Sequence, residues 1–516
     1  MFKCSVSGHP VDVSDNRGWK PTHEAASGNY VQCLTILLKH DVTDVNWVSF
    51  EGISALLLAA QHGHVKCVRL LLQHGADPNL ADHMGNTPLL AATKAHSLEC
   101  VRSLVQNAAD INHQQYCGTS ALHQTASEGL VDIMRHLVEH DANLHVMEEY
   151  HISPVFSAAQ YGQTACLKIL LDRDTSTSPG ERLVNCAAED GATPLFLASQ
   201  EGHTDCVKLL LHHGADANLT THEPVALPLH AALQFDHVQC VELLLHHTDQ
   251  SVLAKCYTSV FNFASMHEST QCTECLVKAG VDVNARHQLP NDDEFVPKLL
   301  RYIENDVTYS QALSPLATIA LYENKLSSVE VLLSHGANPN ACSPDEVPPL
   351  LAALNTGNLD LAELLVSHGA SVNVYHPHIT GNLTLILCLH FWRGLTLMLK
   401  CGAEARSWLV VVSFLQTVFG AKHLMSRAGL STGQVFYRLL QFVGPITLNP
   451  CVEQVLDSGT EWDSITQLIG SPRSLMHCCR LVIRNCLQPR HLVNDECIRM
   501  LAVPPPVVDY ILYADL

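Results

Sequence analysis

The chain is short of charge, and of positive charge most of all. Asp, Glu, Lys and Arg together make up 16% of its 516 residues, with 30 Lys plus Arg against 51 Asp plus Glu. Long disordered tails carry more charge than this, so we expect folded structure along most of the chain. The net charge of -21 disfavours nucleic acid and anionic membrane surfaces as partners, because both repel an acidic protein.

Long hydrophobic runs are also missing. The longest apolar stretch, from Ser407 to Ala421, contains Gln416 and falls short of the ~20 residues of a membrane-spanning helix. We interpret it as a buried helix. The opening MFKCSVSGHP has no apolar stretch of the kind found in a secretory signal. We therefore expect a cytoplasmic protein, with the nucleus as a second location, whose 20 cysteines are free thiols.

Sequence motifs of the common enzyme classes are absent. There is no G-x-x-x-x-G-K-[ST] phosphate loop, no G-x-S-x-G nucleophile motif and no H-E-x-x-H zinc motif. The stretch HEAAS, which begins at His23, has Ser27 where the second zinc-binding histidine is required. We expect no catalytic residue, no metal and no cofactor.

The cysteines follow a pattern that favours structure over chemistry. Several share one position near the start of each expected second helix, namely Cys33, Cys67, Cys100, Cys166, Cys206 and Cys240. A catalytic or zinc-binding cysteine does not recur in this way, so we interpret the position as a small buried side chain. Cys272 and Cys275 form a lone C-x-x-C, without the second pair that a four-ligand zinc site needs. A metal- or thiol-dependent enzyme remains an alternative, which metal analysis and a thiol-reactivity scan would test.

An internal repeat is the strongest feature of the sequence. Gly52, Gly85 and Gly118 lie 33 residues apart, and a period of this length is typical of repeat proteins. In the copy that begins at Gly85, Thr87 can cap a helix and Pro88 suits its first turn, where no amide hydrogen is needed.

Each copy is interpreted as two helices joined by a turn. Gly63 and Gly202 suit the left-handed residue that ends a first helix, and Leu70 to Leu72 would begin the buried face of a second helix. Such a unit cannot bury its apolar faces alone, so neighbouring units must stack.

The copies resemble the ankyrin repeat, whose pattern is close to G-x-T-P-L-H-x-A followed by V-x-x-L-L-x-x-G-A-x-x-N. The resemblance implies an all-α ankyrin-repeat solenoid of about eleven helix-turn-helix repeats with hairpin turns, over residues 16–405 after an N-terminal lead at 1–15. Insertions are expected near 173–185 and 286–311, the second as an extended hairpin or an extra helix. The copies begin near Gly18, Gly52, Gly85, Gly118, His151, Gly191, Val225, Thr258, Leu313, Val347 and Asn382.

The repeat pattern is lost after the array. Residues 406–471 are expected to form buried helices that cap the open end of the solenoid. A helix of about four turns fits residues 472–487. On it Leu475, Cys479 and Ile483 are four residues apart and share one face.

The last segment, residues 472–516, resembles a three-helix SOCS box. Its elongin box would be SLMHCCRLVI at 474–483, and its cullin box would lie at 498–513, near the pattern L-P-L-P-x-x-L-x-x-Y-L. Ala502 departs from that pattern, because it stands where the first proline is usual. The resemblance implies that elongin is bound by Leu475, Met476, Cys479 and Ile483, and cullin by Leu501, Val503, Pro504, Val507, Tyr510 and Ile511.

Ankyrin repeats followed by these two boxes are similar to the ankyrin-repeat and SOCS-box family. The resemblance implies a substrate-recognition adaptor of a cullin-RING ubiquitin ligase. The repeats would hold a target protein for ubiquitination and proteasomal degradation, while the SOCS box would bind elongin B and elongin C, and cullin five with a RING-box protein. The chemistry would take place on other subunits. The alternative is an ankyrin scaffold without a ligase role, whose last helices only cap the array.

Large side chains fall in or beside the expected hairpin tips, which precede the Gly position of each repeat. They are Trp47, Phe50, Met84, Tyr116 and Tyr150. Exposed aromatic and Met side chains are typical of interface hot spots, so we expect them to contact the substrate protein. The alternative is that each packs on a neighbouring tip.

Overall fold

The computed structural model divides the chain into two compact units, Met1–Asp249 and Gln250–Leu516. The residues that the structure describes are 13–39, 43–174, 182–222, 225–253, 260–265, 270–285, 287–288, 312–322, 325–341, 348–373 and 397–403.

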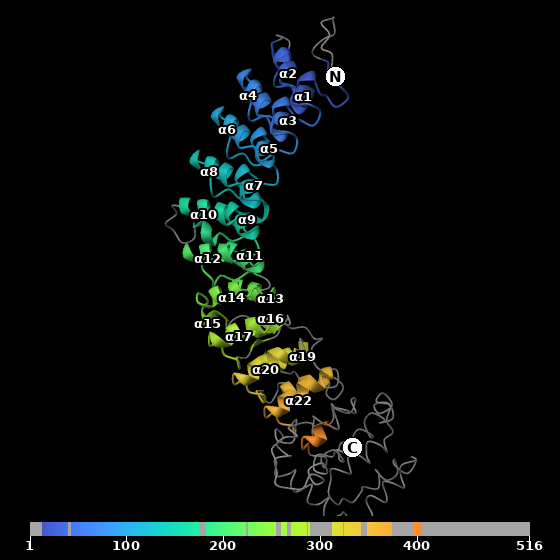
Figure 1. The fold of residues 1–516 in the computed structure, drawn as a ribbon, viewed down its shortest axis with the longest axis vertical. Coiled ribbons are helices and arrows are strands. Elements are labelled where there is room, and N and C mark those ends of the chain that lie inside the picture. Colours follow the sequence, from blue (N-terminus) through green and yellow to red (C-terminus); the bar gives the residue numbers. More distant parts are fainter. Residues whose placement is uncertain are drawn as a thin grey trace, which may run out of the picture. The chain divides into compact units, whose positions relative to one another are not determined.

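The described part of the first unit is built from seven consecutive helix pairs. In Figure 1 the first helices of the pairs form one row and the second helices form another, so that each pair packs on the next. The pairs are α1 (Pro21–Ser27) with α2 (Val31–Leu38), α3 (Ala55–Gln61) with α4 (Val65–Gln73), α5 (Pro88–Lys94) with α6 (Leu98–Gln106), α7 (Ala121–Glu128) with α8 (Val131–Glu139), α9 (Pro154–Gln160) with α10 (Thr164–Arg173), α11 (Pro194–Gln200) with α12 (Thr204–His212), and α13 (Pro228–Gln234) with α14 (Val238–Leu245). Two short 3-10 turns, η1 (Glu149–His151) and η2 (Leu183–Asn185), complete the unit.

The first helix of a pair begins where the sequence predicts. The Thr87 side chain accepts a hydrogen bond of 3.3 Å from the Leu90 amide, and Pro88 occupies the first turn of α5. Gly63 and Gly202 end α3 and α11 with positive φ angles of 65° and 74°, which a residue with a Cβ adopts only at a cost. Local chemistry therefore sets both ends of these helices.

The buried face of a second helix begins before the leucine run, at the recurring cysteine. In α4 the buried residues are Cys67, Val68, Leu71 and Leu72, whereas Leu70 is only half-buried. The prediction that this face begins at Leu70 is wrong, because positions 67, 68, 71 and 72 share one side of a helix and position 70 does not.

The second unit is built in the same way, with an insertion between two of its helix pairs. Its elements are α15 (Gln250–Leu253), α16 (Val260–Ser265), α17 (Gln271–Lys278), β1 (His287–Gln288), β2 (Ala312–Leu313), α19 (Pro315–Tyr322), α20 (Leu326–Ser334), α21 (Pro349–Thr356) and α22 (Leu359–Ser367). The strands β1 and β2 pair antiparallel, with His287 opposite Leu313, so the insertion near 286–311 begins and ends as a two-stranded ribbon. The residues between the strands lie outside the described part.

A ladder of asparagine side chains ties neighbouring pairs together. The Asn112 Oδ1 atom accepts a hydrogen bond of 2.7 Å from the Asn143 amide, one repeat further along. In the second unit Asn284 accepts from the Asn338 amide at 2.8 Å. The repeats on either side of the insertion are therefore direct neighbours. The other steps are Asn46 to Asp77, Asn79 to Asp110, Asn185 to Asp216, Asn218 to Asp249 and Asn340 to Ser371.

The expected all-α ankyrin-repeat fold is confirmed, since the described residues of the first unit form seven helix pairs and those of the second unit form three. The first ten expected repeat starts, from Gly18 to Val347, each precede one of these pairs. The eleventh, near Asn382, lies outside the described residues, as do the buried helix expected at 407–421 and the capping segment at 406–471. The proposed boundaries of these segments stay predictions.

No helix in the described ranges is long and apolar enough to cross a membrane.

Removing one step of the asparagine ladder should weaken the stack measurably. The variant Asn112→Ala leaves the Asn143 amide without its side-chain acceptor. Because this amide lies near the surface, we expect a loss of only about 1 kcal/mol in the free energy of unfolding. Urea denaturation would measure it. Gln106→Ala, at an exposed position on α6, is the matched control, and an equal loss in both variants would show that the ladder does not stabilise the stack.

Candidate functional site

A hairpin tip connects each helix pair of the first unit to the next, and neighbouring tips are joined by backbone hydrogen bonds. The bonds run from Phe50 N to Arg17 O (3.1 Å), His83 N to Glu51 O (3.0 Å), Tyr116 N to Met84 O (3.5 Å), Glu149 N to Cys117 O (3.2 Å), Glu189 N to Tyr150 O (2.9 Å) and His222 N to Asp190 O (2.8 Å). The tips therefore form one continuous edge.

The five side chains expected to bind substrate all lie on this edge, and all are exposed. The exposed fractions are 37% for Trp47, 69% for Phe50, 68% for Met84, 81% for Tyr116 and 63% for Tyr150. Large apolar side chains left open to solvent in consecutive repeats form a surface available to a partner. Their role in binding a substrate stays a prediction.

Trp47 is the most constrained of the five. Its Nε1 donates a hydrogen bond of 3.0 Å to the Gly18 carbonyl, and the Lys20 ammonium lies 3.8 Å from its ring centroid. The indole therefore packs partly on the preceding tip, as the alternative interpretation proposed for such residues. Tyr116 and Tyr150 have larger exposed fractions than Trp47.

The fifth repeat departs from the others at its tip. Tyr150 and His151 adopt positive φ angles of 63° and 60°. At the position of His151 the first four repeats carry glycine, as in Gly85 and Gly118. A residue with a Cβ in this conformation costs of order 1 kcal/mol or more and persists only where the surrounding structure holds it. The hydrogen bond from the Glu189 amide to the Tyr150 carbonyl helps to hold it.

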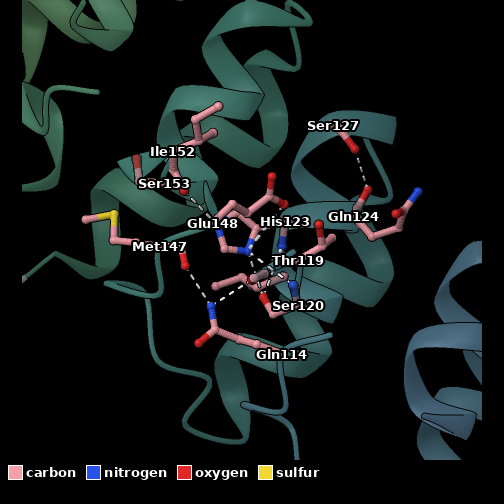
Figure 2. A network of polar contacts seen from close by, with 12 residues as sticks. Gln114, Thr119, Ser120, His123, Gln124, Ser127, Met147, Glu148, Ile152 and Ser153 are labelled. Atoms are coloured by element: carbon pink, nitrogen blue, oxygen red, sulfur yellow. Dashed lines mark hydrogen bonds and ion pairs between the residues drawn. The ribbon is translucent and has the colours of Figure 1, made fainter. Parts of the chain in front are cut away.

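A buried polar network lies next to the hairpin tip at 109–120, which precedes α7 (Figure 2). The Ser120 Oγ atom lies 2.9 Å from His123 Nδ1, and the His123 Nε2 atom lies 3.0 Å from the Ile152 carbonyl oxygen of the next repeat. Because a carbonyl only accepts, Nε2 carries the proton and Nδ1 accepts from the Ser120 hydroxyl. The Ser120 Oγ atom also accepts from the His123 amide at 3.4 Å, so the pair caps α7.

The network is structural and not a nucleophile with its base. Ser120 and His123 are only 1% and 2% exposed, so no substrate reaches them. Burial lowers the pKa of His123 to about 4, and the neutral ring forms no ion pair with Glu148, 3.8 Å away. Burial also raises the pKa of Glu148 above its ordinary value.

The same histidine position recurs in repeats that lack the serine. His23 Nε2 lies 3.1 Å from the Ile53 carbonyl of the second repeat, and its Nδ1 accepts from the Lys20 amide. His230 Nδ1 accepts from the Leu227 amide at 3.1 Å. Recurrence at one repeat position accounts for these histidines without chemistry.

A second set of side chains that the sequence did not single out also joins the repeats. His203 Nε2 bonds the Gln160 carbonyl of the preceding repeat at 3.0 Å, and its ring leaves no room for a Cβ at Gly162. His64 and His237 make the matching bonds to the carbonyls of Ser27 and Gln200. Glycine directly precedes His64 and His203 in the sequence, and this pair was the available signal, whereas His237 follows Asp236.

The recurring cysteines behave as buried packing groups. Cys67, Cys100, Cys166, Cys206 and Cys240 are buried, and Cys33 is half-buried. Cys33 lies in the first pair, where no preceding described pair covers it. Burial raises the pKa of these buried thiols, that of Cys166 to about 11, so the thiolate is disfavoured. Cys272 is buried and Cys275 half-buried, and no group of three or more potential metal ligands occurs among the residues that the structure describes.

Comparison with known protein families gives the array and the C-terminal segment separate matches. A model of three ankyrin repeats matches residues 1–82, 42–115, 89–179 and 122–221, a single-repeat model matches 227–256 and 347–376, and a SOCS-box model matches 471–512. The ankyrin matches together cover more than half of the chain. It belongs to the ankyrin-repeat and SOCS-box family.

Named relatives in the ankyrin-repeat and SOCS-box family match parts of the chain. Ankyrin repeat and SOCS box protein 3 of Homo sapiens is 49% identical over 81 residues, 15% of this chain and 16% of that protein. Protein 14 of Mus musculus is 27% identical over 295 residues, 52% of this chain and 46% of that protein. The chain thus aligns with less than half the length of these relatives. The crystal structure of the human ASB11 ankyrin repeat domain is 26% identical, with a TM-score of 0.39, and covers 45% of this chain and 99% of that one.

Membership of this family bears on the remaining predictions. The matched SOCS box includes both boxes expected at 474–483 and 498–513, apart from the last residue of the second. The individual elongin- and cullin-binding residues lie outside the described part of the chain, so they stay predictions.

The burial of His123 should make the fold sensitive to acid. Unfolded histidine has a pKa of about 6.5, so between pH ~6.5 and ~4 the unfolded chain binds a proton that the folded chain excludes. This contribution is fully present above pH ~6.5 and falls, by at most about 3 kcal/mol, as the pH drops towards 4.

The variant His123→Gln should lose part of this pH dependence, because a glutamine amide does not titrate but can still donate to the Ile152 carbonyl. Urea denaturation at pH 7.5, 6 and 5 would measure the slope of stability with pH. His74→Gln, at the exposed end of α4, is the control. An unchanged slope for His123→Gln would contradict the assignment.

Proposed function

We propose that this chain is the substrate-recognition adaptor of a cullin-RING ubiquitin ligase. The order of its parts carries the proposal: a SOCS-box match at 471–512 follows an array of ankyrin helix pairs. An adaptor needs one surface for a target and another for the ligase, and no catalytic group of its own. The tips supply the first surface, and the SOCS box would supply the second. The expected cytoplasmic or nuclear location suits a chain in whose described ranges no disulfide joins the cysteines.

The target would lie along the tips of the first unit. The exposed side chains of Phe50, Met84, Tyr116 and Tyr150 are the groups available there, and aromatic anchors supply most of the energy in protein interfaces. Ubiquitin transfer would then take place on the cullin and its RING-box partner.

Elongin C, together with elongin B, would grip one face of the helix expected at 472–487. Leu475, Met476, Cys479 and Ile483 are the proposed contacts. On such a helix Cys478 would be turned about 100° from Cys479, so the two adjacent cysteines would have different surroundings.

Leu475→Asp should abolish co-purification of elongins B and C. Burying a leucine gains ~1.5–3 kcal/mol, and the aspartate would be a buried carboxylate without a partner. We expect affinity to fall at least about a hundredfold, while circular dichroism of the repeats stays unchanged. Cys478→Ser is the matched control and should retain elongin. Folded Leu475→Asp protein with full elongin binding would rule out the proposed adaptor.

The cullin surface should be separable from the elongin surface. We expect Leu501→Ala with Pro504→Ala to lose cullin five in a pull-down while elongins B and C remain, because the boxes are distinct segments. Ala502→Pro should maintain or strengthen cullin binding, since it restores the usual proline. Simultaneous loss of elongin would contradict two separate surfaces, and stronger binding to another cullin would contradict the choice of cullin five.

The second candidate function is an ankyrin scaffold without a ligase role. The match to a SOCS box favours the adaptor over it. A chain that binds its target but captures neither elongin B nor elongin C when co-expressed with them would be such a scaffold.

A further inference from the structure

The exposed edge of the first unit combines apolar side chains with one sign of charge. We call the segments 43–54, 76–87, 109–120, 142–153 and 183–193 the tip row. It presents Phe50, Met84, Tyr116 and Tyr150 to solvent. These segments contain no lysine or arginine, and Arg182, which directly precedes the last of them, donates a hydrogen bond of 2.7 Å to the His213 carbonyl. Their acidic residues are Asp44, Glu51, Asp77, Asp82, Asp110, Glu148, Glu149, Glu189 and Asp190.

Part of this negative charge has no partner among the residues that the structure describes. The Asp82 carboxylate already has partners in its own turn, where it accepts hydrogen bonds from the backbone amides of Met84 and Asn86. Glu51, Glu149 and Glu189 are different. All three are exposed, and none forms a side-chain hydrogen bond or ion pair with the described residues. Glu51 and Glu149 adjoin Phe50 and Tyr150 in the sequence, and Glu189 lies in the next tip. The bonds from Glu149 N to Cys117 O and from Glu189 N to Tyr150 O link these carboxylates to the neighbouring tips.

The basic side chains of the first unit do not neutralise the tip row. Most lie on second helices, where they pair locally: Arg69 with Glu99 at 2.6 Å, Arg135 with Asp132 at 3.5 Å, and Lys208 with Asp205 at 3.7 Å. Two lysines reach the tip row: Lys94 donates a hydrogen bond of 3.0 Å to the Asn86 Oδ1 atom, and Lys20 places its ammonium 3.8 Å from the centre of the Trp47 ring. The second is a cation–π contact. That contact shows the type of group which aromatic rings on this edge accept.

We propose that the tip row binds an extended segment of the target protein in which Lys or Arg side chains alternate with apolar ones. This inference deepens the proposed function, on which its target rests. The cations would sit between the free carboxylates and the rings of Phe50, Tyr116 and Tyr150, and the apolar side chains would cover Met84 and the ring edges. Ion pairing combined with cation–π contact favours arginine above lysine, because the guanidinium is planar and less strongly hydrated.

The repeat sets the spacing of the segment. Neighbouring helix pairs are stacked at roughly 10 Å, and an extended chain advances about 3.3 Å per residue. One tip therefore corresponds to about three residues of the ligand. The four tips from Phe50 to Tyr150 correspond to about nine to twelve residues.

The test uses the full chain and a fluorescent twelve-residue peptide that repeats Arg-Leu-Ser. Fluorescence anisotropy should show binding that weakens as salt increases, because surface ion pairs are screened. The same peptide with Glu in place of Arg should bind at least about tenfold more weakly. Equal binding of both peptides, or no binding of the Arg peptide, would overturn the proposal.

Matched variants locate the binding on the edge. The double variant Tyr116→Ala, Tyr150→Ala should weaken binding about tenfold or more, and the triple variant Glu51→Gln, Glu149→Gln, Glu189→Gln should remove most of its salt dependence. Tyr161→Ala and Glu139→Gln, exposed positions outside the tip row, should change affinity less than about twofold. Thermal melts would confirm folding. Equal losses from the control variants would show that the peptide binds elsewhere.

The readout does not involve elongin or cullin. If the chain captured elongins but did not bind the peptide, only this inference would be contradicted. If it bound the peptide but did not capture elongins, only the proposed ligase role would be contradicted.

Discussion

Every helix pair in this protein can bury its apolar face only against its neighbours. The helices of the first unit have between 7 and 10 residues, too few to persist alone in water. Ala59 and Ala60 in α3 have no exposed surface, because the small side chains let adjacent first helices approach closely. Stability therefore resides in the interfaces between repeats more than in any single repeat.

The same constraint explains the many buried polar groups. A stack held by apolar contact alone would slide, whereas hydrogen bonds across each interface fix the register. His123 bonds the Ile152 carbonyl of the following repeat, and Asn112 bonds the Asn143 amide. An isolated Ser120–His123 pair would suggest a catalytic dyad. Within the stack it is one of several equivalent links, since His23 occupies the same position without a serine.

Because the helix faces are committed to stacking, the groups that the stack does not use are the ones available to a partner. The backbone of each tip is bonded to the next tip, so the edge is held in place while its side chains are free to differ between repeats. Tyr150 illustrates this freedom. In the fifth repeat it has a left-handed backbone conformation, and it precedes His151, at whose position the first four repeats have glycine. Binding specificity can therefore change without disturbing the core.

The sequence by itself determined what depends on neighbouring residues in the chain. The 33-residue period, the Thr87 cap and the left-handed Gly63 are local features, and they predicted the helix pairs correctly. Only the tertiary structure decided what depends on contact between repeats: that His123 is buried, and that the repeats flanking the insertion meet through Asn284 and Asn338. Those groups lie 29 to 54 residues from their partners in the sequence. The repeat period shows that the repeats stack, but it does not show which atoms of neighbouring repeats come into contact.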